Sequence, residues 1–214
     1  MHKHDSADER ALSQILKNLT CKTCNPVDGT CTERDGTLAA RFLGGLLHEA
    51  VMGVQHTKDI VVAPDTEQVK ILLQNGAIVD SRNEHKATPL HVAARSNNID
   101  AVSLLVEHGA NLEARNFKGA TPLNNASREG SAEIVAYLIH KGCDVNAQAN
   151  DGKTPLHNAV YRNRIDVIRM LVLNGADTTL RDQYKKTATT QKGIEEATIN
   201  AVNQAVEKRH VVPR

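Results

Sequence analysis

Three related phrases return in this chain at a constant interval, and this periodicity restricts the possible folds more than any other feature. The phrases are Thr88-Pro89-Leu90-His91, Thr121-Pro122-Leu123-Asn124 and Thr154-Pro155-Leu156-His157. Subtracting positions, 121 minus 88 and 154 minus 121 both give 33. A second marker keeps the same interval at Gly76-Ala77, Gly109-Ala110, Gly142-Cys143 and Gly175-Ala176. Two markers with one period indicate a repeat protein.

Each unit is predicted to contain a helix, a turn, a second helix and a loop. Thr88 is a favourable helix cap, and Pro89 suits the first helical position because proline has no N–H to lose there. Leu90, Ala93 and Ala94 then point inward. A second helical pattern (Ile99, Val102, Leu104, Leu105) ends at Gly109, where the chain needs a left-handed residue.

A period of 33 residues that carries Thr-Pro-Leu-His-x-Ala resembles the ankyrin repeat. The resemblance implies an all-α solenoid. It also implies that His91 and His157, with Asn124 in their place in the third repeat, are structural hydrogen-bonding residues. Finally, it implies binding of another protein through the first helices and the loop tips that precede them.

The regular repeats span residues 83–115, 116–148 and 149–181. A first repeat is expected from residue 44, because Leu47-His48 and Ala50 match part of the phrase. Leu47 and Leu90 are 43 positions apart, so about ten extra residues lie between its two helices, within 52–65. Residues 182–214 are a degraded fifth copy, a C-terminal cap and a tail. The prediction is therefore four repeats and a cap.

Residues 1–43 form a separate N-terminal segment. A helix is expected at residues 6–19, because Ser6-x-x-Glu9 is a capping-box pattern and Leu12, Ile15 and Leu16 follow at helical spacing. We expect this helix to cover the first repeat. A free helix that binds a partner or a membrane is the alternative.

Three of the four cysteines, Cys21, Cys24 and Cys31, lie on a turn-rich stretch of this segment. Thiolates on a tight turn suit tetrahedral zinc, but a structural site needs four ligands. The candidates for the fourth are His2, His4, His48 and His56. Reduced thiols in a loop are the alternative. A zinc-stabilised module would have a second recognition surface here. Otherwise we expect no cofactor.

Composition narrows the class of partner. The net charge of +1 argues against bulk attraction to nucleic acid or to anionic membranes. There is no apolar run of roughly 20 residues and no signal-peptide pattern. We therefore expect a soluble cytoplasmic protein, with a nuclear protein or a secreted effector as alternatives.

Catalytic motifs are absent from the sequence. There is no glycine-rich phosphate loop, no His-Glu-x-x-His and no Gly-x-Ser-x-Gly. Cys143 occupies the position of Ala77, Ala110 and Ala176 and is expected in the core. We expect a protein that is not an enzyme. A non-catalytic substrate platform within an enzyme complex is a further alternative.

Positions that vary between the repeats indicate the binding face. Aromatic residues make up only 2% of the chain, yet Phe117, Tyr161 and Tyr184 occupy variable positions that should face outward. Arginines at Arg82, Arg115 and Arg181, and at Arg95 and Arg128, share two registers and are expected to form a basic ladder for an acidic partner. The predicted partner-binding residues are Arg82, His85, Arg95, Arg115, Phe117, Lys118, Asn125, Arg128, Asn158, Tyr161, Arg162 and Tyr184.

Asn146 is a candidate for modification. Leu138, five further residues and Asp144-Val145-Asn146-Ala147 resemble the pattern that asparaginyl hydroxylases read in ankyrin repeats. The alternative is an asparagine that stabilises the loop between repeats.

Overall fold

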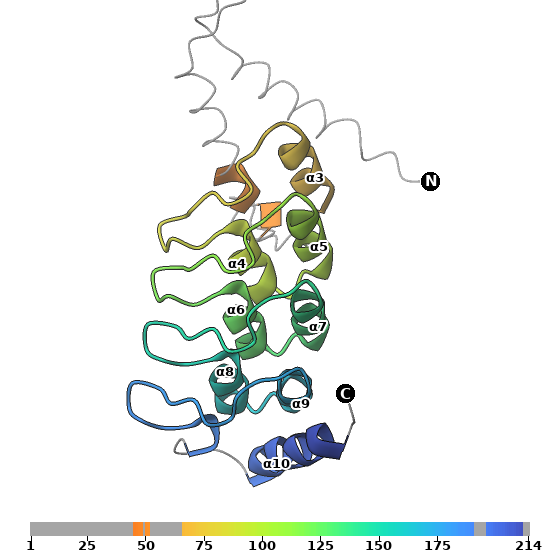
Figure 1. Cartoon of the computed structure of the whole chain (residues 1–214). Helices are drawn as coiled ribbons and strands as arrows, with labels where there is room; N and C mark the ends of the chain where they lie inside the picture. The colour runs from red at the N-terminus through yellow and green to blue at the C-terminus, as the bar shows by residue number, and fades with distance from the viewer. Residues whose placement is uncertain (1–44, 49, 52–65, 191–195, 212–214) are drawn as a thin grey trace, which may run out of the picture.

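Helix pairs stack in a single column in the computed structural model, which describes residues 45–48, 50–51, 66–190 and 196–211. An inner layer contains α4 (Pro89–Arg95), α6 (Pro122–Glu129) and α8 (Pro155–Tyr161). An outer layer contains α3 (Thr66–Gln74), α5 (Ile99–Glu107), α7 (Ala132–His140) and α9 (Ile165–Leu173). The long loops project from the side of the inner layer (Figure 1). This is the all-α solenoid of stacked helix pairs that the 33-residue repeat predicts.

The inner helices begin where the repeated Thr-Pro phrase predicts. Thr88, Thr121 and Thr154 have extended backbone geometry immediately before their helices, and a proline follows each of them. The hydroxyl oxygen of Thr154 accepts a hydrogen bond from the backbone N–H of His157 at 3.3 Å. The cap thus satisfies one of the backbone donors that a helix start leaves without a partner.

Glycine follows each outer helix because the chain turns there with positive φ. The φ angles are 85° at Gly76, 82° at Gly109, 92° at Gly142 and 102° at Gly175. Residues with a side chain rarely adopt this geometry. The residue after each glycine is buried, so Cys143 lies in the core, as Ala110 and Ala176 do at the equivalent positions. Burial raises the pKa of the Cys143 thiol to about 12, so it stays protonated.

The core is a continuous column between the two helical layers. Leu90, Leu123 and Leu156 are fully buried on successive inner helices, and the outer helices bury matching aliphatic side chains against them. Burying one such side chain stabilises a fold by about 1.5–3 kcal/mol. Because each unit packs mainly on its neighbours, this energy is spread along the stack.

The four long loops pair with one another. Within the loops, the backbone N–H of Asn83 donates to Ala87 O and that of Asn116 to Ala120 O. Between loops, the N–H of Phe117 donates to His85 O at 3.0 Å, and the N–H of Asn150 donates to Lys118 O at 2.9 Å. These bonds join the loops into one wall beside the inner helices.

The C-terminal end differs in part from the expected cap and tail. After a 3-10 turn, η1 (Ala188–Thr190), the chain forms a 16-residue helix, α10 (Glu196–Val211), which packs against α9. Ala201, Val202 and Ala205 of this helix are buried. This helix was not predicted from the sequence, because its buried apolar side chains are few and small. Their spacing was nevertheless a detectable signal.

Some expectations concern residues outside the described part of the chain. They are the helix at 6–19, the cysteine-bearing turn and the insertion at 52–65. Residues 45–48, 50 and 51 are helical, with Leu47 and Val51 fully buried, as expected for the first helix of repeat one. None of the described helices is long and apolar enough to cross a bilayer.

Candidate protein-binding groove

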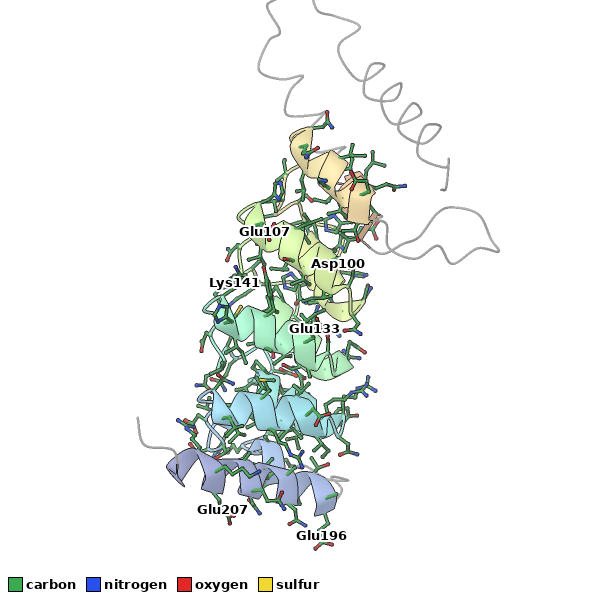
Figure 2. The ribbon with its side chains drawn as sticks, turned by 90° about the vertical axis from the view of Figure 1, so that its right-hand side faces the viewer. Asp100, Glu107, Glu133, Lys141, Glu196 and Glu207 are labelled. Carbon is green, nitrogen blue, oxygen red and sulfur yellow. The ribbon has the colours of Figure 1, made fainter. Side chains whose placement is uncertain are left out.

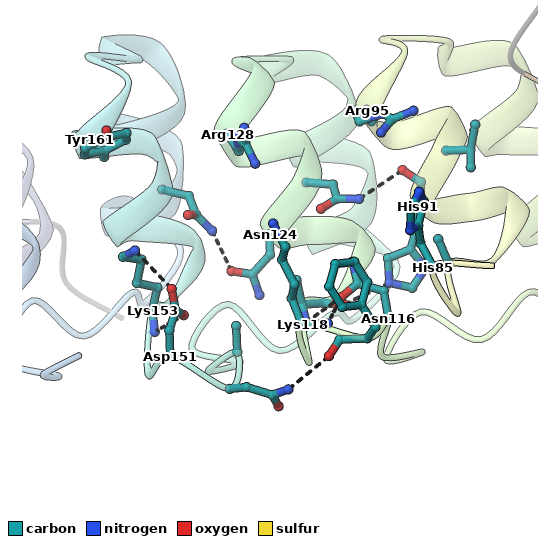
Figure 3. A pocket seen from close by; sticks show the side chains of 18 of the residues that line it. His85, His91, Arg95, Asn116, Lys118, Asn124, Arg128, Asp151, Lys153 and Tyr161 are labelled. Carbon is teal, nitrogen blue, oxygen red and sulfur yellow. Dashed lines mark hydrogen bonds and ion pairs between the residues drawn. The ribbon is translucent and has the colours of Figure 1, made fainter. Parts of the chain in front are cut away.

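A groove of about 870 Å³ runs along the stack between the inner helices and the loop wall (Figure 3). Its residues come from α4, α6, α8 and the loops that precede and follow them. Most of the predicted partner-binding residues line it, namely His85, Arg95, Phe117, Lys118, Asn125, Arg128, Asn158, Tyr161 and Arg162. The structure therefore brings together side chains that are up to 77 positions apart (162 minus 85).

One edge of the groove carries a row of long, exposed side chains. Arg95, Arg128 and Tyr161 lie at the C-terminal ends of α4, α6 and α8, and Figure 3 shows them side by side. Tyr161 is 65% exposed. Arg128 has its Nε 3.8 Å from Glu129 Oε1, but half of its side chain is exposed, and an ion pair of this kind contributes little. Arg128 therefore remains accessible to a ligand.

The opposite edge of the groove, on the side of the loops, carries the exposed aromatic ring of Phe117. Its ring centroid lies 5.6 Å from that of His85, and the Lys118 ammonium lies 5.4 Å from the Phe117 centroid. Despite these contacts, Phe117 is 52% exposed. An exposed aromatic ring beside a cation can bury apolar area and attract an acidic group at the same time.

Asn125 and Asn158 form part of the groove floor, and both also connect neighbouring inner helices. Nδ2 of Asn125 donates to His91 O at 3.2 Å, and Nδ2 of Asn158 donates to Asn124 Oδ1 at 2.9 Å. These positions thus have a structural role that the sequence analysis did not assign to them. A primary amide has two N–H donors and an acceptor oxygen, so each retains capacity for a ligand.

The predicted arginine ladder separates into two sets. Arg95 and Arg128 line the groove, whereas Arg82, Arg115 and Arg181 do not. Tyr184, another predicted partner-binding residue, also lies outside it. Nη1 of Arg82 donates to Arg115 O at 2.8 Å, and Nη1 of Arg115 donates to Gln148 O at 2.6 Å. In these two arginines the guanidinium joins one loop to the next.

Arg181 follows the same pattern within its own loop. Its Nη1 donates to Lys185 O at 2.9 Å, and its backbone oxygen accepts from Gln148 Nε2 at 3.1 Å. Gln148 thus takes the position of Arg82 and Arg115 in the third loop. Side chains in this register hold the loop wall together.

Charge is divided between the two faces of the solenoid. The basic side chains that line the groove are Arg95, Lys118, Arg128, Lys153 and Arg162, and Asp151 is its carboxylate, paired with Lys153 at 3.0 Å. The outer helices instead expose Glu67, Asp100, Glu107, Glu133 and Asp166 against Lys70 and Arg169. Figure 2 shows several of these carboxylates on the outer face.

Asp151 and Lys153 are groove residues that the sequence analysis missed. Lys153 occupies the loop position that Ala87 and Ala120 hold in the preceding repeats. In the 33-residue register this column contains Ala87, Ala120, Lys153 and Lys186, so the change from alanine to lysine was a detectable signal. The Asp151–Lys153 pair adds a carboxylate and an ammonium to the end of the groove near Tyr161, whereas no carboxylate of the described residues lines the end near Arg95.

His91 and His157 form the hydrogen bonds that the repeat phrase predicts. The N–H of Thr88 donates to Nδ1 of His91 at 3.2 Å, and Nε2 of His91 contacts Ala120 O at 2.9 Å. Since a carbonyl oxygen only accepts, Nε2 carries the proton and the ring is neutral. Burial lowers the pKa of both His91 and His157, which favours this neutral form. These histidines are structural.

Asn146 lies outside the groove and joins two successive loops. Its Oδ1 accepts from Asp177 N at 2.8 Å, and its Nδ2 donates to Gly175 O at 3.3 Å. Glu113, one period earlier, accepts from Asp144 N in the same way. A loop-stabilising role therefore accounts for Asn146, and its hydroxylation stays a prediction.

The predicted zinc ligands Cys21, Cys24 and Cys31 lie outside the described residues, as do His2, His4 and His56. Nε2 of His48, the other candidate for the fourth ligand, contacts Ala87 O at 2.9 Å, the same role that His91 has one repeat later. Within the part of the chain that the structure describes, no cluster of three His, Cys, Asp or Glu residues is arranged to hold a metal ion. Zinc stays a prediction, and metal analysis of the purified chain would test it.

Comparison with known families agrees with this geometry. The family model described as Ankyrin repeats (3 copies) matches residues 47–149 and 116–182. Together these matches cover most of the described stack and all of the groove helices. No curated protein matches the chain.

Proposed function

The chain belongs to the ankyrin repeat family, whose members generally act as protein interaction modules, and from that premise we propose that it is a non-catalytic cytoplasmic adaptor. It binds a partner protein with acidic side chains through the groove between the inner helices and the loop wall. Arg95, Arg128 and Lys118 receive the carboxylates of the partner. Phe117 and Tyr161 supply the apolar contacts.

The segregation of charge is the observation that supports this function best. The chain has a net charge of only +1, yet five basic side chains and one carboxylate line the groove. A cleft of one sign attracts ligands of the opposite sign, and the acidic outer helices repel them. Acidic partners are thereby directed to the groove.

Affinity purification followed by mass spectrometry would identify the partner, and three substitutions would then test the groove. Phe117→Ala, Arg128→Ala and Tyr161→Ala should each weaken binding by roughly 1–4 kcal/mol, the range of buried interface anchors. Their folding stability should change little, because all three side chains are exposed.

Glu107→Ala is the matched control, because Glu107 is exposed at the end of α5 on the outer face. It should bind the partner normally. If all three groove variants retained full affinity, the groove would be the wrong surface. The N-terminal segment and the insertion at 52–65 would then be tested by deletion.

A further inference from the structure

The row Arg95, Arg128 and Tyr161 has a regular spacing that a ligand must match. The inner helices that carry these residues pack directly on one another, since Asn125 of α6 bonds to His91 O of α4 and Asn158 of α8 bonds to Asn124 of α6. Packed helices have axes roughly 8–10 Å apart. The three side chains therefore repeat at about that interval along the groove.

Few peptide conformations place side chains of one face at this interval. A polyproline II helix has three residues per turn and rises about 3.1 Å per residue, so positions i and i+3 share a face about 9.3 Å apart. In a β-strand, side chains on one face are about 6.6 Å apart. An α-helix reaches about 10.5 Å only between i and i+7.

The chemistry of the groove floor distinguishes the polyproline II helix from the α-helix. An α-helix satisfies its own backbone groups and binds through an apolar face to an apolar groove. Here the floor contains the partly exposed amides of Asn125 and Asn158. A polyproline II segment leaves its backbone C=O groups available, and the N–H groups of these amides can donate to them.

We propose that the occupant of the groove is an extended segment of the partner protein with acidic residues at positions i and i+3. Arg95 binds one carboxylate and Arg128 binds the other, each guanidinium offering a planar pair of donors. An apolar residue three positions beyond the pair packs on the Tyr161 ring, which is 65% exposed. This inference rests on the proposed function and specifies the partner's sequence pattern.

Synthetic peptides of one composition would test the spacing. Each fluorescein-labelled, proline-rich peptide carries two glutamates, separated by two, three or four positions, and its binding to the full chain is followed by fluorescence anisotropy. The peptide with glutamates at i and i+3 should bind about tenfold more tightly than the other two. Its affinity should fall with added salt, because the contacts are charge pairs.

Substitutions in the chain give the matching readout. Arg95→Ala and Arg128→Ala should each remove the preference for the i, i+3 peptide. Arg169→Ala, which removes the same charge from the outer face, should leave the preference intact. Glu129→Gln should increase the affinity for this peptide, since Glu129 competes for Arg128 at 3.8 Å.

The proposal is overturned by any of three results: equal affinity for the three peptides, absence of binding, or tighter binding of a helical i, i+7 peptide or of an oligodeoxythymidylate. The proposed function would still hold after such a result if Arg128→Ala abolished binding of the partner protein identified by affinity purification. Retention of the partner by all the groove variants would instead contradict the proposed function itself.

Discussion

At the scale of single residues, the repeated histidine connects one repeat to the next. In repeats two and four, Nδ1 accepts from the backbone N–H of the capping threonine, at 3.2 Å for His91 and 3.3 Å for His157. Nε2 of each ring contacts a carbonyl 29 positions later, Ala120 for His91 and Lys186 for His157. Asn124 achieves a similar connection, since its Nδ2 contacts both Thr121 Oγ1 and Ala147 O. The bond to the capping threonine requires an unprotonated Nδ1, whereas Nε2–H can donate to the carbonyl from either the neutral or the protonated ring.

Stability should therefore decrease in mild acid. Burial lowers the pKa of His91 and His157 below the 6.5 of an unfolded histidine. Between the folded and unfolded pKa values the unfolded chain binds more protons, so the free energy of unfolding rises with pH. Their contribution is fully present above about pH 6.5 and is lost as the pH falls below it. Urea unfolding at several pH values would measure the slope.

The double variant His91→Asn, His157→Asn is the control for this prediction, since Asn124 fills the same position naturally. It should show a smaller slope between about pH 5 and 7 than the native chain. Asp80 and Arg82 act on His91, and Asp182 and Lys153 act on His157. An unchanged slope in the variant would assign the acid sensitivity to other groups.

Substitution of Ser127 should stabilise the folded chain. Its hydroxyl is fully buried, and it has no hydrogen-bond partner among the described residues. Ala94, at the equivalent position of the preceding repeat, is also fully buried. Ser127→Ala should raise the free energy of unfolding by about 1 kcal/mol, because a buried polar group without a partner is costly. A lower melting temperature for this variant would show that the hydroxyl has a partner.

At the scale of elements, the loop wall depends on close backbone approach as well as on turn geometry. Gly119 has a φ of 69° and lies next to the following loop, where an added Cβ would meet the backbone nitrogen of Asn150 at 2.9 Å. Gly109, with a φ of 82° after α5, has open space around the equivalent point. Gly109 is therefore needed only for its positive φ. Gly119 is needed both for its positive φ and for the close approach of the next loop.

Alanine substitutions at Gly109 and Gly119 should lower the free energy of unfolding by different amounts. Gly109→Ala adds only left-handed strain, about 1–2 kcal/mol. Gly119→Ala adds the steric conflict with the Asn150 loop and should cost roughly 1–3 kcal/mol more. Chemical denaturation would compare the two variants. Equal losses of stability would mean that the loops can separate without cost.

At the scale of the whole molecule, α10 closes the C-terminal end of the stack. It packs against α9 and buries Ala201, Val202 and Ala205. Thr198 Oγ1 donates to Asn163 Oδ1 at 2.9 Å, which attaches the start of α10 to the turn between α8 and α9. The end repeat of a solenoid needs such a cover, because its outer neighbour is missing.

Disrupting this cap should destabilise the chain and expose an apolar surface that promotes self-association. Val202→Asp places a charge where the native side chain is 2% exposed and should lower the free energy of unfolding by about 3 kcal/mol or more. Gln204→Asp adds the same charge at an exposed position of α10 and should have little effect. Thermal unfolding and size-exclusion chromatography would compare them. Equal behaviour would show that α10 contributes little as a cap.

The sequence by itself determined the repeat architecture of this protein. The 33-residue period, the Thr-Pro helix starts and the glycines after the outer helices are local signals, repeated several times. Each is set by backbone chemistry within a few residues. The structure confirms the solenoid, the buried Cys143 and the structural histidines for that reason.

Only the tertiary structure decided what the polar side chains do. Arg82 and Arg128 look alike in the sequence, yet Arg82 bonds to a carbonyl 33 positions away and Arg128 lines the groove. Helix α10 is stabilised by its packing on α9, not by a strong pattern of its own. Contacts between units depend on how the units stack, and that geometry is absent from any single repeat. The division of charge between the two faces arises at the same level.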